Sequence, residues 1–235
     1  MASRNLTATA AIALSLVVAA CSNTRGDAAT APRDEPPLIV TGSSGSRFHG
    51  TLLDPPLPRP TQAVRDTSGR AFSLVDRPVD ELTVLFFGYT HCPDVCPTTM
   101  ADLASARDQL PAPLRDRVTV VFVTEDPERD TPRSLRRWLD GFDPSFVGLR
   151  GGNEATKAIL EQLYLPATKR QEHPKDSIKH PDSGTKHHHH GDYAVEHAGV
   201  LYAFGPGRTT VIYTGGTKPS EYAADFTKLL QGGPK

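Results

Sequence analysis

Two segments of the chain are almost continuously apolar, Leu82–Gly88 and Arg117–Thr124. Runs of this length, rich in valine and phenylalanine, predict strands that are buried on both faces of a sheet. Ala71–Leu74 predicts a shorter strand ahead of them. Near the other end, Val200–Phe204 and Thr209–Tyr213 flank a Gly-Pro-Gly turn, which predicts a β-hairpin.

Amphipathic segments with recognisable first turns alternate with these strands. Proline suits the first turn of a helix, and Thr or Asn suits the position before it. The predicted helices are Pro97–Leu110, Pro132–Asp140 with Thr131 as its cap, Asn153–Tyr164 with Asn153 as its cap, and Ser220–Leu230. The order strand, helix, strand, helix, hairpin, helix predicts an α/β protein with a thioredoxin-like fold, in which helices flank a central mixed sheet.

The N-terminal residues predict export. A single positive charge precedes Leu6–Ala20, an uncharged apolar run that falls short of the roughly 18–20 residues of a spanning helix. The run ends in Val-Ala-Ala-Cys, which resembles a bacterial lipobox with Cys21 as the lipidated residue. The alternative is an ordinary cleaved signal that leaves Cys21 as a free thiol. We therefore expect a lipoprotein on the outer face of the bacterial cell membrane, with a signal at 1–20, a tether at 21–49 and a domain at 50–235.

Composition is that of one modest globular domain. Of 235 residues 37% are hydrophobic, and the formal net charge is −1. A near-neutral charge gives no basis for a nucleic-acid partner.

The chemistry of the chain is concentrated at Cys92 and Cys96, between the first buried strand and a predicted helix. Because Pro97 suits the first turn, we expect Cys96 to cap the helix, where the positive end of the helix dipole favours a thiolate. Two such thiols can exchange with a disulfide or hold a soft metal ion. A structural disulfide is disfavoured, because structural bridges normally close longer loops.

Three segments together carry a family resemblance. The segment from Gly88 to Thr98, Gly-Tyr-Thr-His-Cys-Pro-Asp-Val-Cys-Pro-Thr, resembles the signature of the Sco/SenC family, thioredoxin-like copper proteins that help assemble the CuA centre of cytochrome c oxidase. Asp126–Pro132 is similar to the acidic segment of that family, and Tyr193–His197 to its metal-histidine segment. The resemblance covers about residues 50–230.

The resemblance implies a ligand set and a partner. It places the copper thiolates on Cys92 and Cys96, the copper imidazole on His197 and an acidic neighbour on Asp126. Asp126 can also be read as a turn residue ahead of a proline. The chain departs from the family at Glu196, where Asp is usual, and we expect an adjusted geometry there. The implied cargo is Cu(I) or Cu(II), and the implied partner is the copper-accepting subunit of cytochrome c oxidase. Thiolates suit Cu(I), and imidazole suits Cu(II) as well.

A histidine-rich insertion precedes the metal-histidine segment. Residues 166–192 contain few large apolar side chains and include His187, His188, His189 and His190, so we expect a surface loop. Histidine-rich tracts bind metal ions. The tract is thus either an auxiliary copper site or a solvated loop with incidental affinity.

Two functional classes remain open. A metallochaperone, which is not an enzyme, would bind copper through Cys92, Cys96 and His197. A thiol-disulfide reductase would cycle the two cysteines and keep the cysteines of its target reduced. The three residues between the cysteines and the distant His197 favour the metal, because thioredoxin-type enzymes normally have two intervening residues and need no such histidine. A peroxidase on the same fold would leave the histidine segment without a purpose.

Overall fold

The computed structural model describes residues 47–172 and 193–232. Cys21 and the histidines at 187–190 lie outside these residues. No helix of the described part is both long and apolar enough to cross a bilayer.

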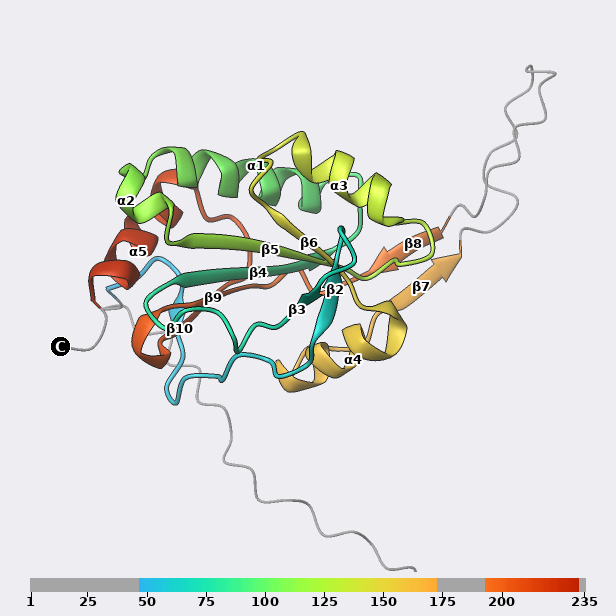
Figure 1. Cartoon of the computed structure of the whole chain (residues 1–235), viewed down its shortest axis with the longest axis horizontal. Helices are drawn as coiled ribbons and strands as arrows, with labels where there is room; N and C mark the ends of the chain where they lie inside the picture. Colours follow the sequence, from blue (N-terminus) through green and yellow to red (C-terminus); the bar gives the residue numbers. More distant parts are fainter. Residues whose placement is uncertain (1–46, 173–192, 233–235) are drawn as a thin grey trace, which may run out of the picture. The chain divides into compact units, whose positions relative to one another are not determined.

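One mixed eight-stranded sheet forms the centre of the domain (Figure 1). Its two longest strands, β4 and β5, run parallel and in register from Leu82 opposite Val118 to Gly88 opposite Thr124. β6 is parallel to β5, and the other neighbours pair antiparallel. In spatial order the strands are β1 (Thr51–Leu52), β10 (Thr210–Tyr213), β9 (Leu201–Phe204), β4 (Leu82–Gly88), β5 (Val118–Thr124), β6 (Val147–Arg150), β2 (Val64–Asp66) and β3 (Ala71–Phe72).

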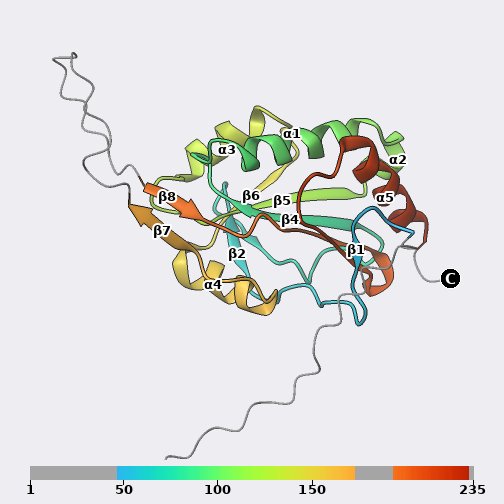
Figure 2. The same ribbon diagram turned by 180° about the vertical axis from the view of Figure 1, so that it is seen from behind.

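A separate two-stranded sheet pairs β7 (Lys169–Glu172) with β8 (Tyr193–Glu196). It lies beside the end of the large sheet where β4 and β5 finish, as Figures 1 and 2 both show. The two sheets share no strand, so β8 is held to the domain by contacts other than the ladder of the large sheet.

Helices cover both faces of the large sheet (Figure 2). One face packs Phe86 and Phe122 against Met100, Leu135 and Phe226, which lie on three different helices. The other face packs mainly against a single helix through Ile159 and Leu160. The helices are α1 (Val95–Asp108), α2 (Ala112–Arg115), α3 (Pro132–Asp140), α4 (Gly152–Gln162) and α5 (Pro219–Gln231), with a 3-10 turn, η1, at Pro206–Arg208.

The predicted fold class is confirmed: the sheet is mixed and central, and helices flank it. Thr131 caps α3 as expected, and its side chain accepts a hydrogen bond from the backbone N–H of Ser134. The expected cap at Asn153 is wrong, because α4 already begins at Gly152, with Gly151 at the cap position. The backbone of Gly152 has a φ of 70°, a left-handed conformation that glycine adopts without strain.

Candidate metal centre

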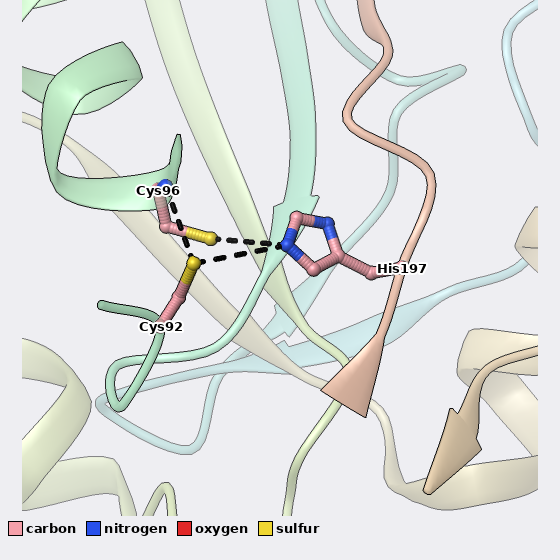
Figure 3. A group of neighbouring side chains, drawn as sticks. All are labelled: Cys92, Cys96 and His197. Carbon is pink, nitrogen blue, oxygen red and sulfur yellow. Dashed lines mark hydrogen bonds between the residues drawn. The ribbon is translucent and has the colours of Figure 1, made fainter. Parts of the chain in front are cut away.

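Three side chains from two distant segments converge at the end of β4 (Figure 3). The Nε2 atom of His197 lies 3.5 Å from the Sγ of Cys96 and 3.9 Å from the Sγ of Cys92. The three possible ligand atoms all lie within 4.8 Å of one another. Among the described residues, no other group of three or more His, Cys, Asp or Glu side chains comes together in this way. Two sulfurs and one imidazole nitrogen form a donor set that suits copper.

The cysteines are placed by the turn from β4 into α1. Cys92 lies in the connecting loop and is half-buried, whereas Cys96 is fully buried. The expected cap at Cys96 is wrong, because α1 begins at Val95 with Asp94 at the cap position. Pro97 is the third residue of the helix, where its missing N–H has no intrahelical acceptor to lose. The backbone N–H of Cys96 points instead at the Sγ of Cys92, 3.5 Å away.

Gly88, the last residue of β4, makes room for Cys96. A Cβ atom at this position would lie 2.5 Å from the Sγ of Cys96 and 3.1 Å from the ring of Phe122. Glycine is therefore required for a close approach, while the backbone itself is ordinary strand. The sequence signal was available, since Gly88 ends a buried strand directly before the cysteine loop, but no role was expected of it.

Asp130 fixes the loop that carries Cys92. Its buried carboxylate accepts hydrogen bonds from the N–H of Thr90 (3.0 Å), the hydroxyl of Thr90 (2.5 Å) and the hydroxyl of Thr124 (2.6 Å). Because β4 and β5 are parallel neighbours, the loops that follow them meet at one edge of the sheet. The acidic segment after β5 thus holds the cysteine loop after β4.

His197 follows β8 directly, and its imidazole is partly enclosed by aromatic rings. The ring of Tyr89 meets it edge to face at 5.7 Å between centroids, and that of Phe86 at 6.3 Å. Burial lowers the pKa of His197, and the backbone of Ala198 opposes this shift. The neutral imidazole that results is the form that can ligate a metal ion. Its Nδ1 atom makes no hydrogen bond of good geometry within the described residues.

Burial also reverses the expected acidity of Cys96. We expected the helix N-terminus to lower the pKa of this thiol, but burial raises it strongly, and the charge on Cys92 raises it further. A hydrogen bond with the backbone of Tyr89 opposes the rise. Desolvation of a fully buried thiolate outweighs the partial charge of a helix end. A metal ion bound here would displace protons from sulfur.

Asp126 does not join the three donor atoms. Its buried carboxylate accepts a hydrogen bond from the hydroxyl of Tyr193 at 2.6 Å and forms an ion pair with Arg129. Tyr193 is the first residue of β8, the strand that leads to His197, and Arg129 also contacts Tyr193. Asp126 therefore contacts the segment that carries the histidine.

Glu125, beside Asp126, is a buried carboxyl without a charged partner among the described residues. Burial raises the pKa of Glu125 to about 7, and a hydrogen bond from Thr168 opposes the rise. The side chain lines a cavity of about 350 Å³ together with Asn153, Thr156 and Arg170. Glu196, the departure from the family pattern, is exposed and accepts a hydrogen bond from Gln171 across the small sheet.

Known proteins are similar to this chain in sequence and in fold. The SCO1/SenC family model matches residues 63–231, more than half of the 235 residues. A protein of Stutzerimonas stutzeri whose provisional name is copper-binding protein is 37% identical over 123 residues, which are 52% of each chain. The chain thus spans about half the length of that curated relative.

Two solved structures are similar over nearly their whole length. Bradyrhizobium japonicum ScoI with copper bound is 29% identical with a TM-score of 0.54, covering 71% of this chain and 96% of that one. Apo Sco1 from Thermus thermophilus is 32% identical with a TM-score of 0.58, covering 81% and 99%. The family expected from the three sequence segments is confirmed: this chain belongs to the SCO1/SenC family.

Proposed function

We propose that this chain is a copper metallochaperone that binds one copper ion through Cys92, Cys96 and His197 and passes it to the CuA-bearing subunit of cytochrome c oxidase during assembly. ScoI of Bradyrhizobium japonicum has been solved with copper bound, and the resemblance of the three sequence segments to the Sco/SenC family implies a role in assembling the CuA centre of this oxidase. The observation that carries the proposal is the position of His197 Nε2, within 3.9 Å of both sulfurs.

The donor set suits transfer as well as binding. Soft thiolates hold Cu(I), and a single neutral imidazole completes the set without closing it. Tetrahedral sites with four protein ligands suit structural zinc better. In this reading the ion is cargo, and the three side chains are a binding site on its route to the acceptor.

A thiol-disulfide reductase is the second candidate function. Cys92 and Cys96 are both free thiols, and the N–H of Cys96 lies near the sulfur of Cys92. Such a pair could cycle to a disulfide and keep the cysteines of the acceptor reduced. The chemistry of that exchange uses the two sulfurs and does not require an imidazole.

The substitution His197→Ala separates the two functions. If the chain is a chaperone, His197→Ala should lower its copper affinity by more than roughly 10–100-fold. A loss in that range is typical when a residue that only orients a metal ligand is removed, whereas His197 would itself bind the ion. Formation and reduction of the Cys92–Cys96 disulfide should continue. The matched control is His91→Ala, which removes an exposed imidazole beside Cys92 that lies outside the donor group.

The decisive measurement is oxidase activity in cells that carry only the His197→Ala protein, with and without added copper. Failure that excess copper rescues supports delivery of the metal. Full activity without added copper contradicts the chaperone and favours the reductase.

We also propose that the chain works at the outer face of the membrane, anchored through lipidated Cys21. The support is the apolar run at 6–20 followed by Val-Ala-Ala-Cys. The Cys21→Ser protein should leave the membrane fraction or fail to mature. A mature N-terminus at any residue other than Cys21 contradicts this anchoring.

A further inference from the structure

The strand that leads to His197 is outside the large sheet. β8 pairs only with β7, through residues such as Val195 opposite Arg170, whereas the cysteines follow β4 at the centre of the eight-stranded sheet. The chain rejoins the large sheet at β9, four residues after His197, and side-chain contacts help to hold the β7–β8 hairpin in place.

Several of these contacts come from the loop after β5. The hydroxyl of Thr168 donates to Glu125, and Arg170 forms an ion pair with Glu128 at 2.7 Å. The hydroxyl of Tyr193 donates a hydrogen bond to the buried carboxylate of Asp126 at 2.6 Å. Both strands of the hairpin are therefore tied to residues 125–128.

Arg129 lies at the centre of this interface. Its guanidinium forms an ion pair with Asp126 and donates from Nη1 to the backbone carbonyl of Tyr193 at 3.0 Å. The same group stacks over the ring of Tyr193, 3.7 Å from the centroid, and lies 5.7 Å from the centroid of Tyr89. Tyr89 in turn meets the imidazole of His197 edge to face. One side chain thus contacts the β5 loop, the start of β8 and the ring that packs on the histidine.

We propose that Arg129 is a positioning residue of the metal centre, which sets the place of His197 relative to Cys92 and Cys96 without touching the ion. This proposal rests on the proposed function for the identity of the bound ion. The contacts described above support the way in which the site is held. Asp130, the next residue, holds the cysteine loop through Thr90, so adjacent residues fix the two halves of the ligand set.

Arginine is the side chain that this position needs. A planar guanidinium can bind a carboxylate and a carbonyl in its own plane while its face stacks on an aromatic ring. A lysine would preserve the positive charge beside the buried Asp126 and would lose the planar stack and the fixed geometry. Arg129→Lys therefore removes positioning while it avoids an unpaired buried charge.

The test compares Arg129→Lys with Arg136→Lys in the reduced full chain. Arg136, on α3, is a matched control because it also binds one carboxylate and one backbone carbonyl, those of Asp140 and Phe146. Hydrogen exchange of the copper-free proteins should show the amides of 193–196 exchanging at least about tenfold faster in Arg129→Lys only. Copper titration should show affinity lowered about 10–100-fold in the same protein.

Two further readouts make the test specific. The cysteine pair should still form and reduce its disulfide in Arg129→Lys, because thiol exchange uses the two sulfurs and does not require the imidazole. Tyr193→Phe retains the ring and loses the bond to Asp126, and it should give a smaller change in the same direction.

Equal exchange of 193–196 and equal copper affinity in Arg129→Lys and Arg136→Lys would overturn the proposal. Faster exchange throughout the domain in both Arg129→Lys and Tyr193→Phe would also overturn it, because the role would then be general stability. If the wild-type chain binds no copper tightly, the proposed function fails, while the exchange measurement still decides whether Arg129 holds the hairpin.

Discussion

Asp130 holds Thr90 by two hydrogen bonds, one from the backbone N–H and one from the hydroxyl, although the two residues are 40 positions apart. Thr90 is two residues before Cys92, so the carboxylate determines where the loop leaves the sheet. The same carboxylate binds Thr124 at the end of β5.

Asp130→Ala should therefore affect both stability and metal binding. The substitution leaves the two threonine hydroxyls without their acceptor, and each buried unsatisfied group costs about 1–3 kcal/mol. We expect urea denaturation to show a loss of about 2–6 kcal/mol, with weaker copper binding. The control Asp140→Ala removes an exposed ion-pair partner and should cost less than about 1 kcal/mol. Equal losses in the two proteins would contradict the role of Asp130.

Gly88→Ala should disturb the metal centre, because Gly88 lies directly against the side chain of Cys96. The added methyl group would lie 2.5 Å from the sulfur of Cys96, so either the sulfur or β4 must move. We expect reduced copper affinity and a lower unfolding temperature. Gly199→Ala is the control, because its nearest neighbour, Val95, would lie 3.7 Å away in ordinary contact. Copper affinity that is unchanged in Gly88→Ala would show that the close approach is not needed.

Glu125 should make the stability of the copper-free protein fall as the pH rises. Burial raises the pKa of Glu125 from 4.5 to about 7, so the native state binds the proton more tightly than the unfolded chain. Ionising the buried group therefore opposes folding, and the loss develops between the two pKa values. At pH 8 the penalty is on the order of 3 kcal/mol.

The substitution Glu125→Gln tests this penalty. It should stabilise the protein at pH 8 and have little effect at pH 4.5, measured by urea denaturation at both values. Glu154→Gln, an exposed carboxylate lining the same cavity, should change little at either pH. A wild-type stability that is flat between these pH values would contradict the burial of an ionisable Glu125.

Replacing His187, His188, His189 and His190 with serine should leave one tight copper site. The tight site is assigned to Cys92, Cys96 and His197, whereas the histidine tract would supply a weaker class of sites. Equilibrium dialysis should therefore show fewer weakly bound ions and an unchanged tight one. Disappearance of the tight site would mean that the tract belongs to the main ligand set.

The long apolar strands could be predicted because burial on both faces leaves a continuous pattern. β4 and β5 begin and end within one residue of their expected positions. β6 and β2 were missed because their sequences, Val-Gly-Leu-Arg and Val-Arg-Asp, contain glycine or charged residues and form no continuous apolar run, unlike the similarly short strands of the predicted hairpin. β8 was also missed, although its residues were recognised as part of a motif, because its alternation is weak and its partner is another short strand.

The candidate ligands could be proposed from residue type and motif. Their surroundings could not be predicted in the same way. Nothing in the sequence alone shows that Gly88 makes room for a sulfur or that Arg129 stacks on Tyr193. The acidity expected of Cys96 was wrong for a related reason. A sequence shows a helix start nearby, but it does not show how completely the side chain is removed from water.

The hairpin that leads to His197 shares no backbone ladder with β4, the strand that precedes the cysteines. Local opening of such an element can require far less free energy than global unfolding. A copper ion bound as proposed would therefore be able to lose its nitrogen ligand while both sulfurs and the eight-stranded sheet remain in place. The rate of metal transfer to an acceptor and the thermal tolerance of the fold would then be separate properties, open to adjustment by different substitutions.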